Sequence, residues 1–180
     1  MPGVPAIPAL TAAICLVLFT AIAGIDGLYF HLYRYRLYRR PQSRREHRLH
    51  TINAFLFVPL VGLLFVAAPH GLFLWLALLL FFASLVVEIL DVLCEPASRR
   101  DLGGITGSEY LMHFLMAGLR FGAVVPLLVT APTDDWLATS TAIGLRPLWL
   151  LLCGAYIAGP GIGIAILHLF LDRRGAAAMR

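Results

Sequence analysis

The stretches EHRLHTINAFL (residues 46–56) and EYLMHFLMAGL (residues 109–119) share the pattern Glu-x-x-x-His-x-x-x-Ala-x-Leu. Each opens a hydrophobic segment and follows another that ends in acid, Asp26 before the first and Glu88 and Asp91 before the second. The acid precedes the pattern by 20 residues in one case (26 to 46) and by 21 in the other (88 to 109). Carboxylates and imidazoles are costly in a membrane, and a metal site is the most economical reason for their repeated placement.

The composition is that of an integral membrane protein. Of the 180 residues, 60% are hydrophobic and 13% are charged, and the mean hydropathy is +0.85. No soluble domain of this size requires so many apolar residues. Cys15, Cys94 and Cys153 are isolated and form no C-x-x-C pair. Neither a disulfide framework nor a thiolate zinc site is therefore supported.

Five apolar segments predict five transmembrane helices, because each is close to the ~20 residues that cross the hydrocarbon core of a bilayer. They cover residues 8–31, 50–68, 71–93, 110–131 and 147–171. The first segment lacks the basic start and the clear cleavage site of a signal peptide, so we expect it to remain as a span. The predicted fold is an all-α integral membrane protein with a single transmembrane domain over residues 1–180.

The arginines predict the orientation in the membrane. All 14 basic residues are arginine, which indicates a GC-rich bacterial genome. Seven lie between residues 34 and 48, two are at 99 and 100, and three are at 173, 174 and 180. Five spans put these twelve on one side, which the positive-inside rule makes the cytoplasm. We expect a bacterial inner-membrane protein with an external N-terminus and a cytoplasmic C-terminus, whose arginines contact anionic lipid and not nucleic acid.

Residues 8–68 and 71–131 resemble the two halves of a tandem repeat. Ile25-Asp26 matches Leu90-Asp91, the two Glu-x-x-x-His units match, and Val-Pro-Leu occurs at 58–60 and again at 125–127. Each half crosses the membrane twice, so both halves run in the same direction. The pattern predicts a four-helix bundle with pseudo-twofold symmetry about the membrane normal, plus one additional helix.

The Glu-x-x-x-His unit places a carboxylate and an imidazole on one face of a helix, since residues four apart lie one above the other. Two such helices, with acids from two others, would surround one or two metal ions. The predicted ligands lie near the cytoplasmic ends of the spans and are Asp26, His31, Glu46, His50, Glu88, Asp91, Glu109 and His113. Glu46 and Glu109 also begin helices, where a carboxylate can complement the helix dipole.

The remaining polar residues are expected to have supporting or neutral roles. Possible partners of the ligands are His47, His168 and Arg120. His47 points away from the face of Glu46 and His50, and Arg120 is expected to pair with an acid inside the bundle, because a charge near the bilayer middle is costly. His70 is expected to take no part. We expect Glu95 and Asp101 to be solvated loop charges.

Four carboxylates and two imidazoles from four helices resemble the inventory of the ferritin-like di-iron carboxylate bundles, in which two helices give a lone Glu and two give Glu-x-x-His. The likeness is one of pattern, because the spacing is four residues here and three there. Oxygen and imidazole ligands suit iron, manganese or zinc. The expected cofactor is thus a pair of divalent metal ions, with iron preferred and manganese or zinc as alternatives.

The leading hypothesis is a membrane di-metal oxidoreductase that uses O2 and acts on a lipid, a quinol or another lipophilic molecule at the cytoplasmic face. Three alternatives stay open. Two of the histidines could hold a b-type haem, which leaves the buried acids unexplained. A metal or proton transporter would place its site nearer the midplane. A zinc-dependent membrane hydrolase would use a zinc-bound water. The glycine-rich stretches match no phosphate-binding pattern.

Overall fold

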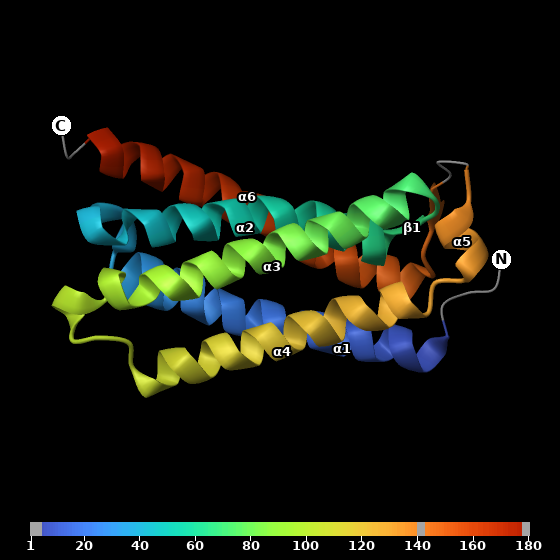
Figure 1. Cartoon of the computed structure of the whole chain (residues 1–180), viewed down its shortest axis with the longest axis horizontal. Helices are drawn as coiled ribbons and strands as arrows, with labels where there is room; N and C mark the ends of the chain where they lie inside the picture. Colours follow the sequence, from blue (N-terminus) through green and yellow to red (C-terminus); the bar gives the residue numbers. More distant parts are fainter. Residues whose placement is uncertain (1–4, 140–142, 178–180) are drawn as a thin grey trace.

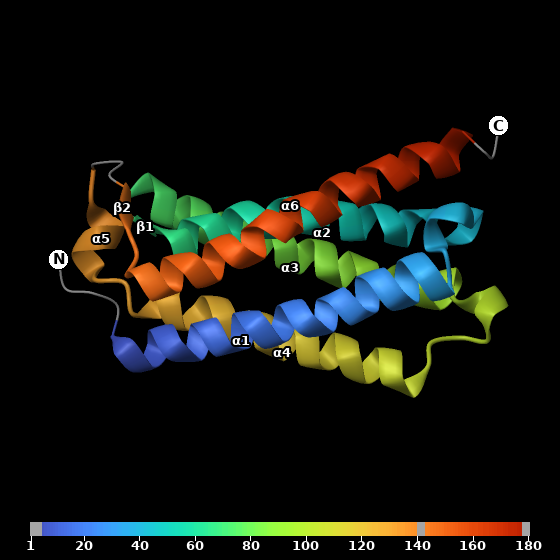
Figure 2. The same ribbon diagram turned by 180° about the vertical axis from the view of Figure 1, so that it is seen from behind.

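The computed structural model describes residues 5–139 and 143–177, with side chains up to Arg174, and shows a bundle of long helices (Figures 1 and 2). In chain order these are α1 (Ala6–Gly24), α2 (Arg44–Val61), α3 (Leu72–Ser98), α4 (Gly107–Val129) and α6 (Leu148–Ala177). Five segments built on these helices are long and apolar enough to cross a membrane. The prediction of a multi-pass helical membrane protein is therefore confirmed.

The two ends of the bundle differ in structure. At one end β1 (Ala67–Pro69) pairs antiparallel with β2 (Ile143–Leu145), beside the short helix α5 (Thr133–Leu137). At the other end lie the connection from α1 to α2, which contains the 3-10 turns η2 (Leu37–Arg39) and η3 (Pro41–Ser43), the connection from α3 to α4 with η5 (Arg100–Leu102), and the end of α6 (Figure 1). The arginine-rich segments thus gather at one end of the bundle, which we call the basic end.

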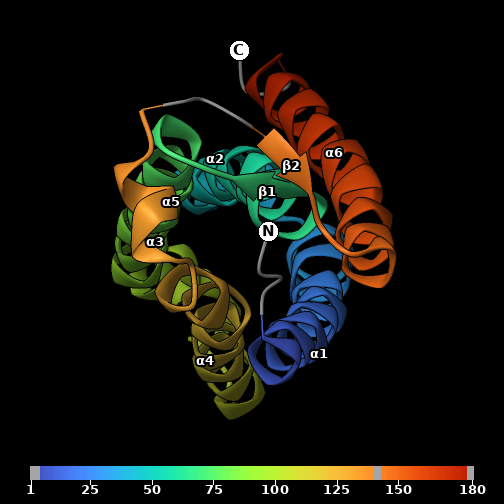
Figure 3. The same cartoon turned by 90° about the vertical axis from the view of Figure 1, so that its right-hand side faces the viewer.

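Seen along its axis, the bundle is a ring of five helices (Figure 3). α1 packs along α4, while α2 packs between α3 and α6; α3 and α4 touch much less. Close packing of α1 on α4 depends on small residues, since a Cβ added to Gly122 would lie 2.6 Å from Sγ of Cys15. Such contacts between small residues are typical of helices packed in membranes.

The apolar core occupies the half of the bundle away from the basic end. Each long helical segment contributes at least one fully buried leucine to it: Leu16, Leu60 and Leu64, Leu74, Leu127 and Leu150. They lie near the ends of the helices that face β1 and β2. Van der Waals packing holds the helices together here, because lipid tails are as apolar as leucine and provide no hydrophobic drive for association. The basic half of the bundle is built differently, around buried polar residues.

Two helices extend further toward the basic end than the hydropathy predicts. α2 begins at Arg44, not at residue 50, and α3 continues to Ser98, not to 93. The predicted ends followed the change from apolar to charged residues. The acids in these added turns are buried and paired with other segments, Glu46 with Arg99 and Glu95 with His113, and this lets the helices continue.

α1 continues as a π-helix, η1 (Ile25–Arg34), which carries Asp26 and His31. In a π-helix the hydrogen bonds join residues five apart, and such turns are frequent at functional sites. Asp26 and His31 are five apart and therefore lie on the same side. In an α-helix, residues four apart share a face, so His31 would not lie on the side of Asp26. A left-handed Arg36 (φ 51°) then ends the segment and turns the chain toward α2.

Candidate metal centre

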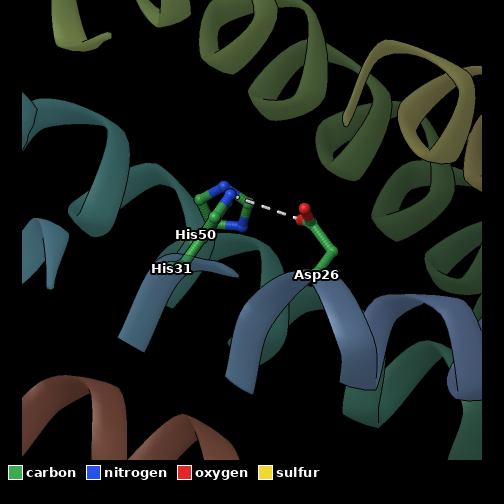
Figure 4. A group of neighbouring side chains, drawn as sticks. All are labelled: Asp26, His31 and His50. Carbon is green, nitrogen blue, oxygen red and sulfur yellow. Dashed lines mark ion pairs between the residues drawn. The ribbon is translucent and has the colours of Figure 1, made fainter. Parts of the chain in front are cut away.

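Six acidic and imidazole side chains come together between the helices of the basic half. We call this cluster the histidine tier, and its members are Asp26, His31, His50, Asp91, Glu95 and His113. The metal-binding atoms of Asp26, His31 and His50 lie within 4.8 Å of one another. Figure 4 shows these three side chains converging from η1 and α2. The rings of His31 and His50 are 4.2 Å apart between centroids.

Two histidine–aspartate pairs in this tier lie at ion-pair distance without the geometry of a hydrogen bond. Nε2 of His50 is 3.0 Å from Oδ2 of Asp91, and Nε2 of His113 is 3.4 Å from Oδ1 of Asp26. Both Nε2 atoms, together with Oδ1 of Asp26, are buried and have no hydrogen-bond partner among the described residues. Two atoms that bind one metal at 2.0–2.1 Å lie roughly 2.9–3.4 Å apart in octahedral or tetrahedral geometry. The observed separations therefore match the edges of a coordination shell.

Asp26 presents its two oxygens to different histidines. Oδ1 faces Nε2 of His113 at 3.4 Å, and Oδ2 lies 3.4 Å from Nε2 of His31. A carboxylate so placed can bridge two metal ions. Because Asp26 is 2% exposed, water cannot satisfy its oxygens as it would at a surface.

Glu95 belongs to this tier, and the prediction that it is a solvated loop charge is wrong. It is 3% exposed, and its Oε1 lies 3.0 Å from Nδ1 of His113. α3 continues past the predicted end of the span, so Glu95 stays helical and shares a face with Asp91, four residues before it. A carboxylate on the far nitrogen of a metal-binding imidazole orients the ring and raises its basicity. Asp101, by contrast, is exposed as expected and bonds to Gln42.

The two motif glutamates meet in a second cluster nearer the basic end, which we call the arginine tier: Tyr35, Glu46, Arg99 and Glu109. Nη1 of Arg99 donates to Oε2 of Glu46 at 2.7 Å, and its Nε donates to Oε1 of Glu109 at 3.1 Å. Both carboxylates are fully buried. One buried guanidinium therefore compensates the charges of two buried carboxylates. From the sequence, Arg99 is expected only as a charge at the membrane surface.

Glu109 has no free oxygen for a metal. Its Oε2 accepts from the hydroxyl of Tyr35 at 3.0 Å and from the hydroxyl and backbone N–H of Thr106, while its own N–H donates to Thr106. This is a capping box at the start of α4. Glu46 differs, because its Oε1 has no hydrogen-bond partner among the described residues and lies 3.7 Å from Nε2 of His31.

Arg99 and His31 connect the two tiers. Nη2 of Arg99 lies 3.1 Å from Nε2 of His31. Burial lowers the pKa of the Arg99 guanidinium, but the carboxylates of Glu46 and Glu109 outweigh burial and hold its pKa above the usual value. Sequence reasoning missed Arg99 as a site residue. The signal was present in the spacing, since Asp91, Glu95 and Arg99 are each four residues apart.

Glu88 lies apart from the two tiers, in an ion pair deeper in the bundle. Nη1 of Arg120 is 2.9 Å from Oε2 of Glu88 and donates to Oγ of Ser84 at 2.8 Å. The guanidinium lies over the rings of Phe19 and Phe57. The prediction that Arg120 pairs inside the bundle is confirmed, and Glu88, a predicted metal ligand, is its partner.

The other histidines lie outside the histidine tier. His47 is buried against α6, where its Nε2–H donates to the backbone carbonyl of His168 at 3.1 Å and the two rings stack 5.0 Å apart. Both ring nitrogens of His168 have no hydrogen-bond partner among the described residues. His70 lies at the opposite end of the bundle, paired with Asp135 at 2.7 Å. Its distance from the cluster agrees with the expectation that it takes no part.

A cavity of about 730 Å³ adjoins the histidine tier and is lined by all five long helices. Asp26, His50 and His113 line its polar end, and Phe57 and Val61 line its apolar end. Cavities of this size hold small-molecule ligands in other proteins. The clustered donor atoms thus face a space large enough for a substrate.

Comparison of the chain with protein-family models, with curated proteins and with solved structures finds no match. A function for this protein is therefore argued from the residues of the two tiers and from the cavity.

Proposed function

We propose that this protein is a membrane-embedded di-metal oxidoreductase that acts on a lipophilic substrate at the cytoplasmic face. His50 and Asp91 would hold one metal and His113 the other. Asp26 would bridge the two, and His31 would complete the first site. Glu95 would orient His113. In this proposal Glu46 retains one free oxygen for a metal, whereas Glu88 and Glu109 serve the ion pair and the arginine tier.

The close approach of the two histidine–aspartate pairs without hydrogen bonds is the observation that carries this proposal. Buried polar atoms in proteins are almost always paired, and buried charges are paired or coordinate metals. Here buried nitrogen and oxygen atoms from α2, α3, α4 and η1 face one another at ion-pair distances of 3.0 and 3.4 Å, and Nε2 of His50, Nε2 of His113 and Oδ1 of Asp26 make no hydrogen bond among the described residues. One or two cations between them would satisfy all of these atoms together.

We also propose that the two halves, residues 8–68 and 71–131, are a tandem repeat, and the pairing of ligands supports this. A twofold axis that relates α1 to α3 and α2 to α4 would relate Asp26–His113 to Asp91–His50. These are the two close pairs. The same axis relates the packing of α1 on α4 to that of α3 on α2, the two helix pairs that pack most closely. α6 is the additional helix.

Oxygen and imidazole donors favour iron, with manganese and zinc as alternatives. When bound, a pair of redox-active metals would supply the chemistry of O2 binding and electron transfer. The chain itself would hold the metals, shield them from water and admit an apolar molecule through the cavity. We assign the basic end to the cytoplasm of a bacterial inner membrane, because the arginine-rich segments lie there.

Metal analysis and an absorption spectrum of the purified protein test the proposal. We expect about two iron atoms per chain and no haem band. In His50→Ala and His113→Ala, metal should be lost while membrane insertion continues, because the apolar spans drive insertion. His70→Ala is the matched control and should retain both metals, since His70 lies at the opposite end.

Other results would favour other functions. A haem band would support a cytochrome, and a single zinc would support a hydrolase. A protein without metal, whose His50 and His113 variants behave like the unchanged protein, would refute the metal centre and leave a proton path or a transporter.

A further inference from the structure

The cavity beside the histidine tier is long and runs along the bundle axis. On α2 its lining extends from His50 to Val61, eleven residues or about 16 Å at 1.5 Å per residue. The histidine tier closes the end nearer the basic side. Phe19, Phe57 and Val61 line the other end, in the apolar half of the bundle. The cavity is therefore polar at one end and mainly aromatic and aliphatic at the other, where the guanidinium of Arg120 lies over the rings of Phe19 and Phe57.

The cavity has an opening toward the lipid between α3 and α4. These helices touch little although they are neighbours in the ring (Figure 3). Leu93 from α3 and Phe114 from α4 line the cavity, and each is 72% exposed. Both lie within membrane-spanning helices. In a bilayer this opening faces hydrocarbon, so the molecules that reach it most readily are those dissolved in the membrane.

An ion pair on the cavity wall limits how a guest can lie. Glu88 and Arg120 line the cavity beside the aromatic end, where the guanidinium lies over Phe19 and Phe57, and Ser84 and Asn53 hydrogen-bond to the guanidinium. Beyond this pair the lining offers no charged partner among the described residues. A polar headgroup is thus favourable only at the end near the tier, and the apolar end suits a hydrocarbon tail.

We infer that the cavity binds the hydrocarbon chain of a membrane lipid, with its tail toward Phe57 and Val61 and its head-proximal carbons at the histidine tier. This inference rests on the proposed function for its chemical meaning. It specifies the substrate class, a long-chain acyl or isoprenoid lipid that enters sideways between α3 and α4. It also specifies the position of reaction, close to the headgroup and not at the end of the chain.

Photolabelling tests where the hydrocarbon chain of the lipid lies. The protein would be reconstituted in phosphatidylcholine–phosphatidylglycerol nanodiscs with palmitic acid that carries a diazirine either near the carboxyl group or near the methyl end. The tail label should mark peptides containing Phe19 and Phe57, and the head label should mark peptides containing His113. A farnesol-based diazirine is the second arm, and the stronger labelling of the two identifies the acyl or isoprenoid class.

A pair of glycine substitutions serves as the matched control. Gly24 lines the cavity, and a Cβ there would meet nothing within 4 Å, so the side chain of Gly24→Leu starts in open space beside the cavity. Gly118 on α4 is also free of neighbours but is exposed and does not line the cavity. Leucine favours a helix over glycine in both places. We expect tail labelling to fall about tenfold in Gly24→Leu, equivalent to ~1.4 kcal/mol, and to be unchanged in Gly118→Leu.

Labelling that spreads evenly over the lipid-facing surface, or that is the same in Gly24→Leu, overturns the inference. So does a tail label that marks His113 in place of Phe57. Metal analysis of the same samples separates this inference from the proposed function. If the protein holds two metals but labelling is uniform, only the inference about the lipid is refuted. If the cavity is labelled but no metal is present, the location of the hydrocarbon chain is supported and the di-metal function is refuted.

Discussion

The arginine tier and the histidine tier lie next to each other and are both buried, but their hydrogen bonding differs. In the arginine tier, Arg99 joins Glu46 and Glu109, and both oxygens of Glu109 accept hydrogen bonds, while Oε1 of Glu46 has no partner among the described residues. In the histidine tier, Nε2 of both His50 and His113 lacks a hydrogen-bond partner among the described residues. The largely saturated arginine tier suits a structural role, whereas the histidine tier has more hydrogen-bonding capacity left for a ligand.

Each Glu-x-x-x-His motif contributes to both tiers. Its glutamate lies in the arginine tier and its histidine in the histidine tier, because four residues correspond to about 6 Å along a helix. The motif thus combines a structural acid with a candidate metal ligand. Substitutions in the two tiers should therefore separate stability from metal binding.

The largest effect on stability is expected for Arg99→Met. Removing the guanidinium leaves the buried carboxylates of Glu46 and Glu109 without compensation, and breaking such a buried pair costs about 3–5 kcal/mol. Unfolding by SDS in mixed micelles measures this loss. The protein that remains folded should keep its metal, since His50 and His113 are unchanged.

Arg100→Ala is the control, because Arg100 is exposed beside the buried Arg99. It should change stability by no more than about 0.5 kcal/mol. An equal loss in both variants would mean that positive charge in this loop, and not the buried contacts of Arg99, stabilises the basic end.

An intermediate effect, on metal affinity, is expected for Glu95→Gln. The amide keeps the size of the side chain but weakens its hold on Nδ1 of His113, and loss of such a partner typically lowers metal affinity about 10–100-fold. Competition with a chelator measures the affinity. Glu88→Gln is a matched change on the same helix, outside the histidine tier, and should leave the affinity unchanged. If Glu88→Gln weakens metal binding as much as Glu95→Gln, then Glu88 belongs to the metal centre and not only to the ion pair with Arg120.

The smallest effect is expected for Thr106→Ala at the start of α4. It removes the side chain of the capping box, which costs about 1 kcal/mol. Unfolding in SDS should show this loss with metal content unchanged, while Ser108→Ala, an exposed neighbour, should show less. Loss of metal in Thr106→Ala would show that the arginine tier positions the ligands and does not act on stability alone.

The sequence predicted much of the fold and part of the site. Long apolar segments are a strong signal, so the five spans were predictable, although their ends were not. The span ending at 93 was placed there because Glu95 and Arg99 are charged. Hydropathy treats such residues as solvated, whereas in the structure they are buried by partners from other helices. For the same reason hydropathy predicts Glu95 in a solvated loop and gives no sign that Arg99 is buried.

By itself, the sequence determined that the chain crosses the membrane several times and that its acids and histidines repeat near one end of the spans. Only the tertiary structure decided which of them meet. The π-helix η1 brings His31 into line with Asp26, Arg99 draws Glu46 and Glu109 into one tier, and Arg120 pairs with Glu88. The physical reason is that a buried charge adopts whichever partner the packing of the other helices places within reach, and spacing along one helix does not contain that information.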